Sequence, residues 1–139
     1  MSVASIITAA QVINAGVTGV TSAPDLSALP LTLESIQLPA AIVIPGQATW
    51  QRAGMGGGWK CERQYMIRCL VTPDSTEPVI AFPRVAALIE AMGAVWRATK
   101  TVGGALVTNV EDQGSQRTYG YGGAQFYGCE FRITVKETN

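Results

Sequence analysis

The chain has 139 residues, a length typical of one domain, and such a domain buries about two-thirds of its unfolded surface. Ten Lys and Arg balance ten Asp and Glu, and only 14% of the residues are charged, against about 25% in a typical soluble domain. Zero net charge argues against broad nucleic-acid binding, which needs surplus Lys and Arg to neutralise phosphates. The sparse charge leaves much neutral surface, which favours burial of part of it against partner chains.

Membrane insertion and export are not expected. No run of about 18 apolar residues occurs. Residues 1–20 lack the basic start and continuous apolar block of a signal peptide, because Thr8, Gln11 and Asn14 interrupt the apolar pattern. Three cysteines without close spacing indicate reduced thiols in a cytosolic setting. They are Cys61, Cys69 and Cys129.

An amphipathic helix is predicted over residues 3–16. Ser2 can cap its start, and Gly16 and Gly19 favour its end. Apolar residues recur at helical spacing and would form one stripe. The stripe consists of Val3, Ile6, Ile7, Ala10, Ile13 and Val17.

Residues 18–39 predict an extended arm. Three prolines break any helix, and only two residues are charged, yet a leucine-rich series is apolar. A linker of about 20 residues is uncommon in a compact domain and often functional. We expect the arm to lie against protein, either its own domain or a neighbouring subunit in a ring. Its apolar residues are Leu26, Leu29, Leu31, Leu33, Ile36 and Leu38.

The middle of the chain predicts three strands. Residues 40–44 are a β-run that Pro45-Gly46 closes, and residues 48–53 are a second short strand. Residues 54–58, with Met55 among glycines, are a flexible hairpin tip. Residues 59–72 are a long strand whose side chains alternate between two faces. Cys61, Arg63, Tyr65, Ile67, Cys69 and Val71 share one face, and Lys60, Glu62, Gln64, Met66, Arg68 and Leu70 share the other.

A second amphipathic helix is predicted after the turn at Pro73-Asp74-Ser75. Pro78 and Pro83 are tolerable only near a helix start, and the helix should end near Lys100, before Gly103-Gly104. Its apolar stripe consists of Val85, Leu88, Ile89, Met92, Val95 and Trp96.

The C-terminal part predicts three strands. Residues 106–111 and 117–121 are short strands around a turn at Asp112-Gln113-Gly114, and residues 125–137 are the last strand. Its alternation implies one buried and one polar face. Tyr127, Cys129, Phe131, Ile133 and Val135 point one way, and Glu130, Arg132, Thr134 and Lys136 point the other. Runs of strands separated by helices predict an α+β fold, mainly an antiparallel β-sheet with two amphipathic helices packed on it, in a single domain over residues 1–139.

No catalytic or metal site is expected. The chain has no histidine, which removes the commonest general base and metal ligand, and cysteines at zinc spacing are absent. Residues 54–58 lack a following Lys-Ser/Thr and do not open a helix, so we interpret them as a hairpin tip rather than a phosphate loop. Cysteines on apolar strand faces indicate core packing, and Glu111-Asp112 indicates a solvated turn. We therefore predict no enzymatic activity and no cofactor.

Aromatic residues stand among glycines near the C-terminus. Tyr119, Tyr121, Phe126 and Tyr127 could stack on nucleic-acid bases, but Lys and Arg do not surround them. Tyrosines are also enriched at protein interfaces, and ordinary packing is the third interpretation. With the arm and the hairpin tip, these residues give a set of candidate interface residues. The set consists of Leu26, Leu29, Leu31, Leu33, Met55, Tyr119 and Tyr121.

The order of elements resembles the tail terminator (tail completion) proteins of long-tailed phages with non-contractile tails. Residues 38–44, Leu-Pro-Ala-Ala-Ile-Val-Ile, resemble the family's first strand, and residues 59–72 resemble its long alternating strand. The Pro-Asp-Ser turn at residues 73–75 leads similarly into the amphipathic helix. Residues 127–135, Tyr-Gly-Cys-Glu-Phe-Arg-Ile-Thr-Val, are similar to its last strand. The longer arm and the glycine-rich tips depart from the family.

The resemblance implies a homo-oligomeric ring, usually a hexamer, seated on the end of the tail tube in the virion after synthesis in the host cytoplasm. Its partners would be the tail tube protein and the head-tail connector protein, with DNA passing through the lumen without sequence recognition. Two alternatives remain open. One is another phage neck or head-completion protein, and the other is a small enzyme or ligand-binding α+β domain.

Overall fold

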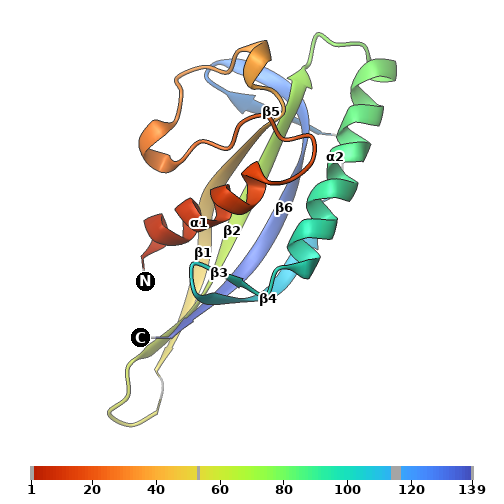
Figure 1. Cartoon of the computed structure of the whole chain (residues 1–139). Coiled ribbons are helices and arrows are strands. Elements are labelled where there is room, and N and C mark those ends of the chain that lie inside the picture. Colours follow the sequence, from red (N-terminus) through yellow and green to blue (C-terminus); the bar gives the residue numbers. More distant parts are fainter. Residues whose placement is uncertain (1, 53, 114–116, 139) are drawn as a thin grey trace.

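The computed structural model describes residues 2–52, 54–113 and 117–138. An antiparallel sheet carries two helices, which confirms the predicted α+β class (Figure 1). The helices are α1 (Val3–Ala15) and α2 (Pro78–Ala98), and the arm contains two short 3₁₀ helices, η1 (Leu26–Ala28) and η2 (Ser35–Gln37). The strands are β1 (Ala40–Arg52), β2 (Trp59–Pro73), β3 (Thr101–Val102), β4 (Ala105–Asp112), β5 (Arg117–Tyr121) and β6 (Ala124–Thr138).

The long strands β2 and β6 form the centre of the sheet. The strand order is β1-β2-β6-β4-β3, and β5 also pairs with β6. Because Asp112 pairs with Phe131 and Arg117 pairs with Gly128, β4 and β5 follow one another along the same edge of β6. The predicted turn between them falls partly on residues 114–116, which lie outside the described residues.

Two strand predictions need correction. The sequence predicts separate strands over residues 40–44 and 48–53, but residues 40–52 form the single strand β1, with a register shift between Pro45 and Ala48, and residue 53 lies outside the described residues. A proline is compatible with β1 because β1 is an edge strand, where one side needs no ladder hydrogen bonds. The two-residue strand β3 was not predicted, since two residues carry no alternation.

Both helices pack on one face of the sheet, and the predicted stripes supply the contact (Figure 1). Ser2 caps α1 as expected: its hydroxyl accepts a hydrogen bond from the Ser5 amide, and the Ser5 hydroxyl accepts one from the Ser2 amide. The predicted inward faces of β2 and β6 meet these helices. The core includes Ile6, Ile7, Ala10, Tyr65, Ile67, Cys69, Val85, Met92, Trp96, Cys129, Phe131 and Ile133.

The helix α2 begins at Pro78, and Pro83 lies within its N-terminal half rather than at its start. By length and composition α2 could cross a membrane, so the expectation that no segment qualifies was too strict. Its face containing Val85 and Met92 is buried in the core. The helix thus packs on the sheet, and its outer side exposes Arg84, Glu90 and Arg97.

Three polar side chains in the core connect the two helices to β1 and the arm. The indole of Trp96 donates to Asn14 Oδ1 at 2.9 Å, and the Asn14 amide donates to Gln11 Oε1 at 3.0 Å. The Gln11 amide in turn donates to the carbonyl oxygens of Ala41 (2.8 Å) and Pro24 (2.9 Å). These polar groups are buried and fully engaged, as burial requires.

Replacing Phe131 tests the register of β6. Phe131 is 1% exposed and its ring lies against α2 at Gly93. Phe131→Ala should lower the free energy of unfolding by about 3–5 kcal/mol, because it leaves a cavity. Thr134→Ala, on the other face of β6, should change it by less than about 1 kcal/mol. Denaturant titration of both variants measures the difference, and equal effects would show that the assigned faces are wrong.

Candidate assembly interface

The arm lies against its own domain along its course. At its root, Ser22 forms a bridge with Ala40 of β1, and the Ala41 amide donates to the Ser22 carbonyl at 2.9 Å. The Ser22 hydroxyl donates to the Gln37 carbonyl at 2.7 Å. The arm therefore starts beside the first residues of β1, forms a loop and returns to the same end of that strand.

A second apolar cluster holds the middle of the arm on the sheet face opposite the helices. Its buried members are Ile42, Leu70 and Phe126, and Leu33 and Leu38 of the arm pack against them. Tyr119 and Tyr121 of β5 pack there as well, and the Tyr121 hydroxyl donates to the Pro30 carbonyl. Gly122, whose φ is +59°, lets the turn after β5 approach Leu31 closely.

The seven predicted interface residues therefore separate into two groups. Leu33, Tyr119 and Tyr121 are half-buried and fasten the arm to the sheet, so each exposes only part of its side chain to a second chain. Leu26 and Leu29 are exposed on η1 and beside it, and Leu31 is 92% exposed. Met55 is fully exposed at the hairpin tip. The four exposed residues remain candidates for contact with another chain.

The hairpin between β1 and β2 exposes two tryptophans close to the tip that carries Met55. Trp50 is 48% exposed and Trp59 is 43% exposed, and the Arg52 guanidinium lies 4.6 Å from the centroid of the Trp59 ring. Sequence reasoning treated Trp50 and Trp59 only as strand residues. Their position on either side of a glycine-rich tip was a sequence signal of exposure. A hairpin that extends beyond the rest of its sheet leaves the side chains near its tip uncovered.

The start of α2 exposes another apolar group. Val79, Ile80 and Phe82 are all exposed, although the Phe82 ring also makes an edge contact with Tyr127 of β6. In Figure 1 this end of α2 lies at the top of the molecule, and the tip of the β1–β2 hairpin lies at the bottom. The two apolar surfaces therefore occupy opposite ends of the molecule.

A groove opens between the arm and α2 at the C-terminal end of β2. Its volume is about 500 Å³, within the range of ligand and side-chain pockets. Leu38 and Pro39 of the arm form one wall, Ala87 and Leu88 of α2 form the other, and Val71 of β2 also lines it. Arg84 is the one charged residue among the described residues that line the groove. The groove can thus accept an apolar group.

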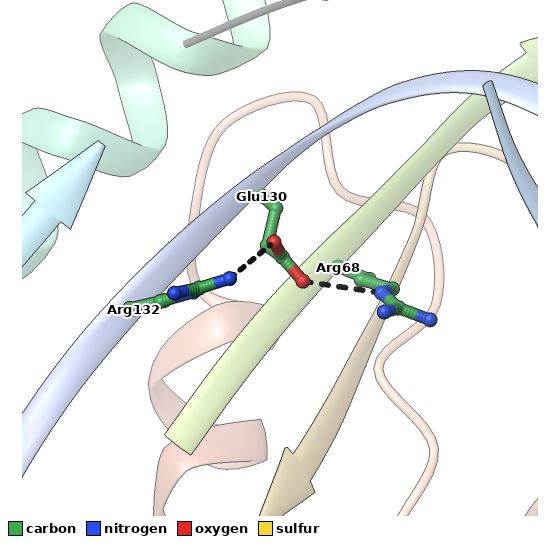
Figure 2. Close-up of polar contacts among 3 residues, drawn as sticks. All are labelled: Arg68, Glu130 and Arg132. Carbon is green, nitrogen blue, oxygen red and sulfur yellow. Dashed lines mark hydrogen bonds and ion pairs between the residues drawn. The ribbon is translucent and has the colours of Figure 1, made fainter. Parts of the chain in front are cut away.

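The sheet face opposite the helices carries a charged cluster (Figure 2). Glu130 of β6 is 7% exposed, and its carboxylate lies 3.2 Å from Arg68 Nε and 3.8 Å from Arg132 Nη2. The Arg68 guanidinium also lies 5.5 Å from the centroid of the Tyr119 ring. One carboxylate between two guanidinium groups ties β2 to β6 and leaves an excess positive charge on this face.

The three thiols are free and buried, which confirms their predicted core positions. Burial raises the pKa of Cys61, and a hydrogen bond with Cys129 together with burial raises the pKa of Cys69 well above its usual value. Burial, assisted by the nearby Glu137, also raises the pKa of Tyr65 to about 12. Cys61, Cys69 and Tyr65 thus stay protonated at neutral pH, whereas a nucleophile needs a lowered pKa.

Within the described part of the chain, no three His, Cys, Asp or Glu side chains are grouped so as to hold a metal ion. Comparison with known proteins finds no family model that matches the chain and no curated protein sequence that matches it. The interpretation of the candidate interface consequently depends on the geometry and on the resemblance in element order.

Thiol labelling tests the burial of the cysteines. In native protein at pH 8, a thiol reagent should modify Cys61, Cys69 and Cys129 at least roughly tenfold more slowly than a free cysteine, because all three thiols are buried. Denaturation should release three reactive thiols. Rapid labelling of the native protein would contradict this arrangement.

Two leucine substitutions test which side of the arm packs against the sheet and which side faces outward. Leu33→Ala should lower the free energy of unfolding by about 1–2 kcal/mol, because Leu33 is half-buried against the second cluster. Leu31→Ala is the matched control and should change stability by less than about 0.5 kcal/mol, because Leu31 is 92% exposed. Thermal or denaturant unfolding measures both. An arm that detaches in solution would make both substitutions silent.

Proposed function

We propose that the protein is a structural subunit that closes into a homo-oligomeric ring and has no enzymatic activity. The observation that carries the proposal is the separation of exposed apolar side chains onto two opposite ends of the molecule. The β1–β2 hairpin, with Met55, Trp50 and Trp59, extends to one end, and the start of α2, with Val79, Ile80 and Phe82, lies at the other. Two different surfaces suit a head-to-tail contact, which closes into a ring when the rotation between neighbours permits.

The ring we propose is a phage tail terminator, by the resemblance in element order. It would be a hexamer that sits on the end of the tail tube in the neck of the virion and stops the tube from growing. One side would contact the tail tube protein and the other the head-tail connector protein, and DNA would pass through the lumen without sequence recognition. Another neck or head-completion protein is the alternative, with the same ring and different neighbours.

A small ligand-binding domain is less well supported. Ligand sites combine an apolar cavity with a few converging polar groups. The groove beside α2 is lined mainly by apolar groups, with Arg84 as its charged residue among the described residues. Such a lining suits an apolar protein side chain better than a polar metabolite.

The mass of the protein in solution tests the ring. Light scattering over a range of concentrations should give one defined oligomer larger than a dimer, and electron microscopy of assembled particles should place a ring of the protein at the head-proximal end of the tail. A protein that stays monomeric at high concentration and forms no ring in particles would refute the proposal. Reproducible turnover in a hydrolase or transferase screen, abolished by replacing one polar residue, would refute the absence of enzymatic activity.

A further inference from the structure

We propose that the tip of the β1–β2 hairpin of one subunit docks into the groove between the arm and α2 of the next subunit. The inference rests on the proposed homo-oligomer and identifies its contact surfaces. The occupant of the groove is a second copy of this chain, and the inserted side chains are Met55, Trp50 and Trp59.

The hairpin presents its apolar side chains on one face. Trp50 pairs with Cys61 and Arg52 pairs with Trp59 across the hairpin, so these residues share the face that farther along the sheet meets the helices. The hairpin extends past α1 and α2 (Figure 1), which leaves that face uncovered at Trp50 and Trp59. Gly54 and Gly56 have φ values of +87° and +70° and form the tight tip that projects Met55.

The groove is shaped to receive such a tip. Leu88, which is 4% exposed, and Val71 contribute to its apolar lining, and Pro39 and Ala87 lie on opposite walls. A volume of about 500 Å³ accommodates more than one large side chain. Met and Trp are side chains that gain from burial in apolar pockets of a partner, Met because it adapts to irregular shapes and Trp because of its large apolar area.

The charges at the two ends are complementary. Arg52 and Lys60 stand next to the hairpin tip, while Glu62 lies farther along β2, opposite Lys136. Around the groove, Glu34 precedes the lining residue Ser35, Asp74 follows the lining residue Pro73, and Glu77 caps α2. These three exposed acids outnumber Arg84. A basic tip and an acidic groove margin attract each other and set the orientation of docking.

The two surfaces cannot meet within one subunit. The strand β2 runs from Trp59 at the hairpin to Pro73 at the groove, and its residues span roughly 45 Å when extended. Docking therefore joins different copies head to tail, and each copy uses its hairpin once and its groove once.

Two variants that each disable one surface test the docking. Met55→Lys places a charge at the tip without disturbing the fold, because Met55 is fully exposed, and Ala87→Arg blocks the groove from the exposed surface of α2. Each variant alone should lose assembly, with at least a tenfold fall in the apparent association constant. An equimolar mixture should form a one-to-one heterodimer, because one intact hairpin and one intact groove remain between the two chains.

Val12→Lys is the matched control, since Val12 is 71% exposed on α1 away from both surfaces. It should assemble as the unmodified protein does. Circular dichroism and thermal unfolding of all three variants establish that they are folded. If the unmodified protein assembles and both Met55→Lys and Ala87→Arg assemble equally well, the docking is wrong and the ring survives.

Crosslinking tests the contact directly, even if assembly is weak. A Met55→Cys/Ala87→Cys double variant treated with a bismaleimide should give a ladder of covalent oligomers, because the native thiols are buried. Val12→Cys/Ala87→Cys should give no ladder. The absence of a ladder from the first variant would overturn the docking independently of ring images, and loss of vesicle binding by Met55→Lys with assembly unchanged would assign the tip to a lipid surface instead.

Discussion

The hydrogen-bonded series from Trp96 through Asn14 to Gln11 is the constraint on which the rest of the structure depends. Asn14 is fully buried and Gln11 is 4% exposed, so each unmade hydrogen bond would cost about 1–3 kcal/mol. Their partners lie on four different segments: α1, α2, the Ala41 carbonyl of β1 and the Pro24 carbonyl of the arm. Satisfying every group at once allows one relative placement of these segments, which apolar contacts alone specify less sharply.

The same placement of the arm, β1 and α2 also forms the groove. Gly19 and Pro39 belong to the arm root, which Gln11 and the Ser22–Ala40 bridge hold against β1, and Leu88 belongs to the helix that Trp96 anchors. The groove is thus bounded by segments whose distance is fixed in the core. The hairpin at the other end is supported differently, by the pairing of β2 with β6 that continues to Lys60 and Thr138. The hairpin and the groove are therefore both ordered before docking, so docking costs little conformational entropy.

The sequence predicted the elements whose signal is periodic. Alternation along β6 identified its inward face, and the stripe from Val85 to Trp96 identified the inner face of α2. Non-periodic features were not predictable in the same way. Gln11 and Asn14 were interpreted as interruptions of an apolar segment, because the partner that buries Asn14 lies 82 residues away in the sequence. Glu130 fell on the polar face yet is buried, since Arg68 and Arg132 cover it. The course of the arm likewise depended on Tyr121, 91 residues beyond Pro30.

The charges at the two ends of the molecule favour pairing of a hairpin tip with a groove over pairing of two like surfaces. A two-fold contact through one surface alone would place that surface against its own copy. Tip against tip would bring Arg52 and Lys60 near their equivalents, and groove against groove would do the same for Glu34, Asp74 and Glu77, so both arrangements set like charges together. Two hairpin tips also lack complementary shapes, and so do two grooves. Shape and charge therefore both favour the unlike pairing of hairpin tip with groove, which can close reciprocally between two copies or continue from copy to copy into the ring proposed above.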